Sequence, residues 1–178
     1  MKQNIEELLK NDKEFYEILY PIINNDTVLE MKKYKQHYET SCFDHCLSAA
    51  SYCYLICKKL KLDYVSATRA AMLHDLFLYD WRKRQDGRKG LHAFTHGKTA
   101  CENACKLFDL NEKEKDIITK HMWPVTIKLP KSPEAFILTL VDKYCAICET
   151  NEVYQNRILS KKITRYTYIM LCLLIFHI

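Results

Sequence analysis

Hydrophobic side chains recur every three or four residues over most of this 178-residue chain. In residues 40–61 they fall on one broad face, and the segment 63–77 shows the same spacing. Three later segments repeat the pattern, namely 96–108, 111–122 and 132–148. Strands would alternate every two residues, so this spacing predicts helices.

Residues that commonly cap helices stand at the start of four of these segments. Asp63 and Thr95 are predicted N-caps, and Ser132 precedes a proline that suits the first helical position. Asn111 and Glu114 have the spacing of a capping box, in which side chain and backbone satisfy each other. The chain is therefore predicted to form separate helices.

The composition favours an all-α fold. Glycine (3) and proline (4) are scarce, while 48% of the residues are hydrophobic. This length suits one domain with its own core. We expect a compact single-domain helical bundle over residues 1–178, with a metal-binding core at about 40–145. An N-terminal helix at 1–24 and an apolar C-terminal helix at 166–178 are expected to pack on that core.

Charge and cysteine content indicate the surroundings of the chain. The formal net charge of +5 is mixed along the sequence, which suits a mildly anionic ligand and does not require duplex nucleic acid. Nine cysteines without a secretory signal indicate a reducing compartment, so a cytoplasmic location is expected. Their helical spacing favours packing, with thiolate metal binding as the alternative. The apolar run 168–178 is about half a bilayer span, so no membrane span is expected.

Residue types that bind metals lie on the inner faces of the predicted helices. They are His45, His74, Asp75, His96, His121 and Asp142. His74 extends a stripe of small residues, and the adjacent Asp75 can reach the same metal or bridge two. Asp142 follows apolar neighbours, where an isolated carboxylate is costly and needs a cation. Together the six residues predict a metal centre.

A basic segment follows the adjacent histidine and aspartate. The helical periodicity stops over 80–92, where glycines stand beside arginines and lysines. Arg82 and Arg84 are candidates to neutralise phosphate oxygens, because a guanidinium fork matches them. A solvated surface loop is the alternative interpretation. Lys98 and Lys143 are further candidates for substrate binding, on position alone.

The order of a histidine at 45, a His-Asp pair at 74–75 and an aspartate at 142 resembles the HD-domain superfamily of metal-dependent phosphohydrolases. The resemblance extends over about residues 40–145, which is most of the chain. It implies an all-α bundle of the HD type and a hydrolytic metal centre.

Two more histidines extend the resemblance to the binuclear branch of this superfamily. His96 and His121 occupy the places that go with a second ion, and Asp75 would bridge the two ions. The resemblance implies two divalent transition metal ions, with iron preferred and manganese, cobalt, nickel or zinc as alternatives. The implied ligands of the first ion are His45, His74, Asp75 and Asp142.

His92 competes with His96 for one ligand position of the second ion. We prefer His96 because a His-Gly dipeptide at a helix start resembles the usual context in the family. This choice leaves His92 as a substrate contact or proton donor. His37 and His177 have no place in the pattern and are interpreted as structural or surface residues.

The resemblance implies an enzyme that cleaves a phosphoester or phosphoanhydride bond with a metal-activated water, with His74 and Asp75 as its catalytic residues. The ligand pattern is similar to that of the HD-type symmetrical diadenosine tetraphosphate hydrolases. The expected partner is therefore a small phosphorylated substrate, with a nucleotide or dinucleotide polyphosphate preferred. The alternatives are an HD-fold di-iron oxygenase that cleaves a C–C or C–P bond and a non-catalytic metal or nucleotide sensor. An oligomer is compatible with the sequence.

Overall fold

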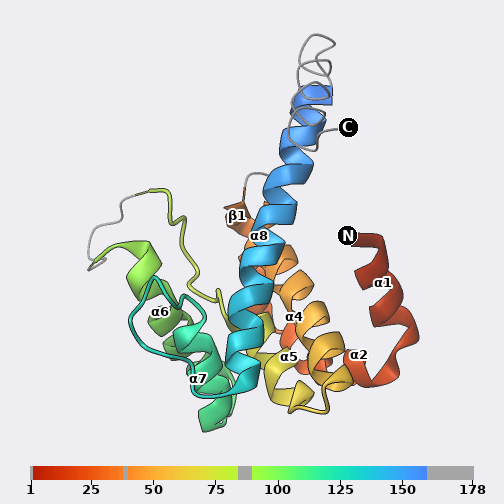
Figure 1. Ribbon diagram of the computed structural model, residues 1–178, viewed down its shortest axis with the longest axis vertical. Helices are drawn as coiled ribbons and strands as arrows, with labels where there is room; N and C mark the ends of the chain where they lie inside the picture. Colours follow the sequence, from red (N-terminus) through yellow and green to blue (C-terminus); the bar gives the residue numbers. More distant parts are fainter. Residues whose placement is uncertain (1, 38–39, 84–89, 160–178) are drawn as a thin grey trace, which may run out of the picture.

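The computed structural model describes residues 2–37, 40–83 and 90–159 (Figure 1). Their helices are α1 (Lys2–Asn11), α2 (Lys13–Ile23), α3 (Asp26–Leu29), α4 (Cys42–Lys59), α5 (Tyr64–Leu73), α6 (His92–Leu107), α7 (Glu112–Lys120) and α8 (Pro133–Leu159). Between α3 and α4 lie the 3₁₀ helix η1 (Glu30–Lys33) and an antiparallel pair of strands, β1 (Lys35–His37) and β2 (Thr40–Ser41). The predicted all-α fold is confirmed. Among the described helices, none combines the length with the apolarity that a membrane span requires.

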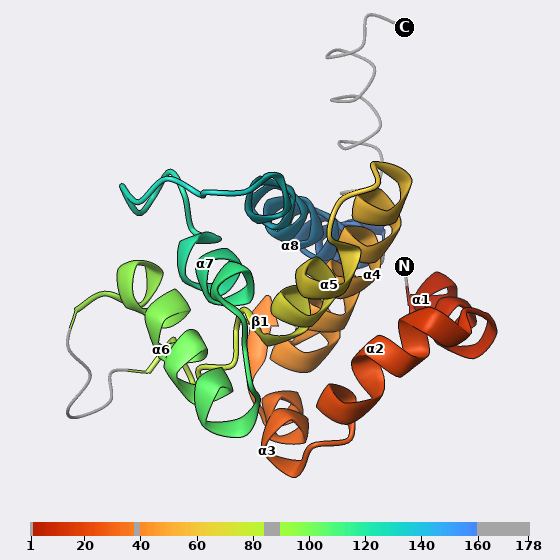
Figure 2. The same cartoon turned by 90° about the horizontal axis from the view of Figure 1, so that it is seen from below.

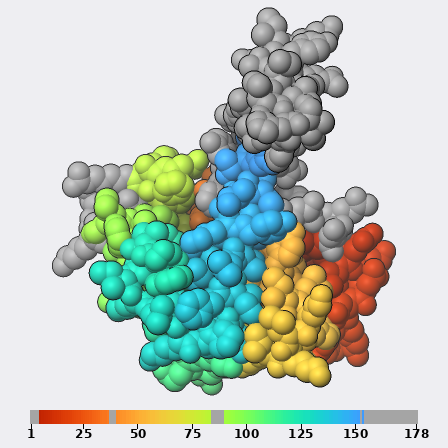
Figure 3. Space-filling model, viewed as in Figure 1, coloured from red at the N-terminus to blue at the C-terminus, as the bar shows by residue number. Residues whose placement is uncertain are grey.

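Helices α4, α5 and α8 form the middle of the molecule. The long helix α8 runs beside α4, with α6 and α7 on one side of this pair and α1 and α2 on the other (Figures 1 and 2). In the space-filling view, α8 lies on the surface between α4 and the segments around α7 (Figure 3). Residues far apart in the sequence therefore meet where α4, α5, α7 and α8 converge.

Small side chains allow the close contact between α4 and α5. Ala67, Ala70 and Ala71 on α5 are fully buried, and α5 makes its largest contact with α4. Helices whose facing side chains are small can bring their backbones close together. This contact fixes the C-terminal end of α5 beside the inner face of α4.

The N-terminal segment forms two helices, whereas the sequence suggested one helix over 1–24. Asp12 separates them because it is the N-cap of α2, where its side chain accepts a hydrogen bond from Phe15 N at 3.0 Å. Phe15 and Leu19 are fully buried, so α2 packs on the core. The helix expected at 166–178 lies outside the described residues.

Most of the predicted helix starts agree with the structure. Asp63 caps α5 by accepting from Ser66 N at 3.0 Å. Asn111 and Glu114 form the predicted capping box, with both hydrogen bonds at 2.8 Å. Thr95 is the exception, because α6 begins one turn earlier and the Thr95 hydroxyl donates to a backbone carbonyl at that end.

A polar network joins α2 to α4 and α5. Glu14 accepts hydrogen bonds from Lys58 Nζ at 2.6 Å and from the Tyr64 hydroxyl at 2.6 Å. It also accepts from the Tyr54 hydroxyl at 3.2 Å. The Lys58 ammonium and the Tyr64 hydroxyl lower the pKa of Glu14 from 4.5 to about 2.

In Glu14→Gln, the free energy of unfolding is expected to fall less in acid than in the wild type. Between pH 4.5 and about 2, the unfolded chain binds a proton at Glu14 that the folded chain does not, so this contribution to stability falls as the pH falls. Urea midpoints across this range should therefore fall less steeply in the variant than in the wild type. Glu17→Gln, which removes only an exposed ion pair with Lys13 on the same helix, should retain the wild-type slope. Equal slopes for Glu14→Gln and the wild type would contradict this prediction.

Candidate metal centre

The adjacent His74 and Asp75 stand at the end of α5. The helix was expected to continue to about Phe77, but its last residue is Leu73 and His74 is the C-cap. The Nδ1 atom of His74 donates to Ala71 O at 2.7 Å, and a continuing helix would have used that carbonyl for the Asp75 amide. Asp75 therefore lies just beyond the helix, and its side chain is buried with that of His74.

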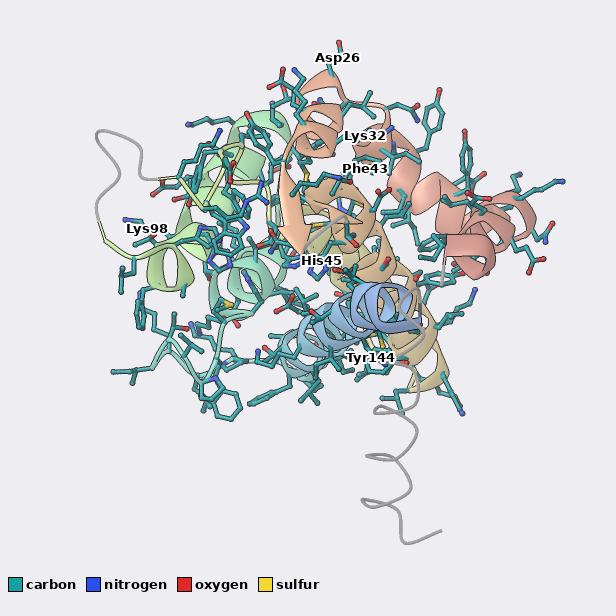
Figure 4. All side chains as sticks on the ribbon, turned by 90° about the horizontal axis from the view of Figure 1, so that it is seen from above. Asp26, Lys32, Phe43, His45, Lys98 and Tyr144 are labelled. Atoms are coloured by element: carbon teal, nitrogen blue, oxygen red, sulfur yellow. The ribbon has the colours of Figure 1, made fainter. Side chains whose placement is uncertain are left out.

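The other candidate ligands approach this pair from four helices. They are His45 on α4, His96 on α6, His121 at the C-cap of α7 and Asp142 on α8. All six side chains are buried. Figure 4 shows His45 in the interior, between the inner sides of α4 and α8.

Five of the six side chains form two groups that share Asp75. The first contains His45, His74 and Asp75, and the second contains Asp75, His96 and His121. Within each group the candidate ligand atoms lie within 4.8 Å of one another. Asp142 adjoins the first group, because its Oδ1 atom lies 3.0 Å from His45 Nε2 and 3.6 Å from His74 Nε2. A carboxylate that belongs to both groups is placed to bridge them.

In their neutral form, three of these histidines point an unprotonated nitrogen into the centre. A carbonyl oxygen only accepts hydrogen bonds, so a ring nitrogen that bonds to one carries the proton. The Nδ1 atoms donate in this way from His74 to Ala71 O at 2.7 Å, from His96 to His92 O at 2.8 Å and from His121 to Ile118 O at 2.7 Å. Their Nε2 atoms are therefore left with free lone pairs.

The atoms of the centre fit a bound cation. The Nε2 atoms of His96 and His121 are only 2.8 Å apart, although both are acceptors. His74 Nε2 and Asp75 Oδ1 are buried without a hydrogen-bond partner in the structure. Divalent ions in the two groups would satisfy all of these atoms, and imidazole with carboxylate is a donor set that suits transition metals.

Burial and nearby charges shift the pKa values of His45 and His121 in opposite directions. Burial disfavours the charged form of His45, but the carboxylates of Asp142 and Glu149 outweigh it and raise its pKa to about 10. Burial and the neighbouring imidazoles lower the pKa of His121 to about 3. His121 therefore offers a free lone pair at neutral pH.

Among the side chains that contact the centre and were not anticipated from the sequence are Glu149 and Gln36. Both oxygens of the buried Glu149 contact His45 Nδ1, at 3.0 and 3.1 Å. Gln36 on β1 donates its side-chain amide to Asp75 Oδ2. The position of Glu149 could have been predicted, because it stands seven residues after Asp142 and so lies on the same helix face. The position of Gln36 could not, because its short strand has no periodicity.

Gly97 allows α6 to approach α7. A Cβ atom at this position would lie 3.1 Å from Ile118 O and 3.3 Å from His121 Cε1. Larger residues would therefore push the two helices apart. The glycine that follows His96 thus lets His96 and His121 meet.

His92 lies beside the centre in a different role from His96. Its ring stacks on that of His96 with centroids 4.4 Å apart, and its Nδ1 atom is 3.0 Å from the Tyr79 hydroxyl. The Trp81 ring also stacks on it, with centroids 5.5 Å apart. The His92 carbonyl accepts the Nδ1 proton of His96, so His92 supports the orientation of that ring.

The basic candidates for substrate binding are widely separated. Lys143 is half-buried near the centre, where its Nζ atom donates to His121 O at 3.4 Å. The Lys98 side chain is 80% exposed and lies at the outer edge of the molecule, away from His45 (Figure 4). Arg82 pairs with a carboxylate of its own loop at 3.0 Å. Arg84 lies outside the described residues.

The HD domain family model matches residues 42–147. This span is more than half of the chain and contains all six candidate ligands. The searches of curated proteins and of solved structures gave no match. The chain therefore belongs to the HD-domain family, whose members are mostly metal-dependent hydrolases.

Proposed function

We propose that this protein hydrolyses a phosphoester or phosphoanhydride bond at a centre of two divalent metal ions. The observation that carries the proposal is the position of Asp75 in both groups of candidate ligands. The two oxygens of a carboxylate can serve neighbouring ions. When bound, such ions supply positive charge that polarises a phosphoryl oxygen and activates a water molecule.

Hydrogen bonds within the protein orient the proposed ligands. Those of the first ion are His45, His74, Asp75 and Asp142. Those of the second ion are Asp75, His96 and His121. Each of the four imidazoles is oriented by a hydrogen bond at Nδ1, which leaves Nε2 to face the centre. His74 and Asp75 thus act in catalysis as ligands.

Two residues beside the centre are proposed to contact the substrate. Lys143 is held near it by hydrogen bonds to the carbonyls of His121 and Thr139, at 3.4 and 3.1 Å. Its ammonium can exchange these bonds for a phosphate oxygen, which would neutralise negative charge during the reaction. His92 is partly exposed beside His96 and is placed to donate a hydrogen bond. A nucleotide or dinucleotide polyphosphate is the substrate class that we propose.

Metal analysis and a phosphoester panel test this function. Protein purified without oxygen should contain two ions per chain and should release nucleotide or phosphate from some member of a panel that includes dinucleoside polyphosphates. Asp142→Ala should lose metal and activity together. Asp109→Ala, at an exposed position before α7, should lose neither. Oxygen uptake without phosphate release would instead indicate the oxygenase, and metal binding without turnover would indicate the sensor.

A further inference from the structure

The imidazole of His45 is held between two carboxylates of the same helix. Asp142 faces its Nε2 atom at 3.0 Å, and Glu149 faces its Nδ1 atom with both oxygens at 3.0 and 3.1 Å. The two acids are seven residues apart, which is two turns of α8. His45 is fully buried and Glu149 is 4% exposed, so water does not weaken this contact.

The hydrogen-bond partner of Nδ1 distinguishes His45 from the other histidines of the centre. The Nδ1 atoms of His74, His96 and His121 donate to peptide carbonyls. A carboxylate is a stronger acceptor than a carbonyl, because the hydrogen bond is charge-assisted. By drawing the Nδ1 proton, Glu149 increases the electron density at Nε2 and makes His45 a stronger ligand.

Glu149 is not itself placed to bind an ion of the centre. Its oxygens contact the Nδ1 edge of the His45 ring, whereas Asp142 approaches the Nε2 atom. The His45 ring therefore separates Glu149 from the other ligand atoms. Glu149 also lies beyond residues 42–147, the span that matches the family.

We propose that Glu149 is a positioning residue that strengthens His45 as a ligand, so that the first ion binds more tightly than the second. This inference rests on the proposed two-ion function. The second ion has no equivalent support from a carboxylate among the described residues, since its two histidines donate to carbonyls. The two positions should consequently fill in order, with the His45 position first.

Glu149→Gln tests the charge of this side chain with little change in shape. The amide oxygen of glutamine can still accept the Nδ1 proton, so the orientation of the ring should survive. Titration of metal-free protein with Mn²⁺ should give two affinities in the wild type. In the variant, the higher Mn²⁺ affinity should fall by about 10- to 100-fold while the lower affinity stays unchanged. His121→Ala should abolish the lower-affinity binding, which assigns that binding to the second ion.

Glu134→Gln is the matched control for this substitution. Glu134 is also a buried acid on α8, and it accepts hydrogen bonds from Asp63 N at 3.0 Å and from Lys113 Nζ at 3.2 Å. Its replacement should leave both Mn²⁺ affinities at their wild-type values. Any general effect of losing a buried charge from α8 would appear in this control.

The absorption spectrum of bound Co²⁺ and a second variant distinguish an effect of the Glu149 charge on His45 from a general loss of structure. The spectrum of Co²⁺ in the tighter position should shift in Glu149→Gln and not in Glu134→Gln. Glu149→Asp retains the charge and should bind more tightly than Glu149→Gln. Equal Mn²⁺ affinities in Glu149→Gln and the wild type would overturn the inference while leaving the two-ion function intact. A wild-type protein that binds no ion would overturn both.

Discussion

Asp75→Asn is expected to remove both metal ions and to lower phosphoester hydrolysis by more than about a hundredfold. Asp75 belongs to both groups of candidate ligands, so one substitution affects both ions. Asparagine keeps the size of the side chain but loses the charge that would balance the two proposed cations. Replacing a residue that only supports a ligand lowers metal affinity or activity by about 10- to 100-fold. Replacing a ligand that both ions share should therefore have a larger effect.

Metal content per chain and the rate of hydrolysis should be measured on the same preparation of Asp75→Asn. Asp26→Asn is the control, because Asp26 is exposed on α3 and lies far from His45 in Figure 4. It should keep the wild-type metal content and rate. An Asp75→Asn variant that retains two ions would show that Asp75 does not bridge them.

Removal of metal is expected to lower the melting temperature by about 5–10 °C for each ion removed. An ion that binds only the folded chain at a hundred times its Kd contributes about 2.7 kcal/mol, and each kcal/mol shifts the melting temperature of a chain this size by about 2–4 °C. The physical reason is the burial of unpaired acceptors, such as His74 Nε2 and Asp75 Oδ1, which an ion satisfies. Melting curves with a chelator and with added Mn²⁺ measure the difference.

The same melting experiment on Asp75→Asn provides the control. Added Mn²⁺ should not stabilise this variant if the centre is the binding site. An equal shift in the variant and the wild type would place the ion elsewhere, with the cysteines as the first candidates. A wild type that melts at one temperature with and without metal would contradict the prediction.

The ends of individual helices were harder to predict from the sequence than the presence of the helices. The periodicity of α5 gave no sign that it ends at Leu73, because the competing bond from His74 Nδ1 to Ala71 O depends on the orientation of a side chain. Thr95 was expected to cap α6, but the helix extends one turn further toward its N-terminus. Local preferences at such ends are weak enough for packing to override them.

The all-α fold and a set of candidate metal ligands could be predicted from the sequence alone. Helical periodicity and the capping box of Asn111 and Glu114 depend on neighbours within about four residues, so they can be read along the chain. The position of Asp75 in both groups of candidate ligands became visible in the folded chain, as did the contact of Glu149 with His45, 104 residues away in sequence. Such contacts depend on how α4, α5 and α8 pack together, which no local pattern specifies.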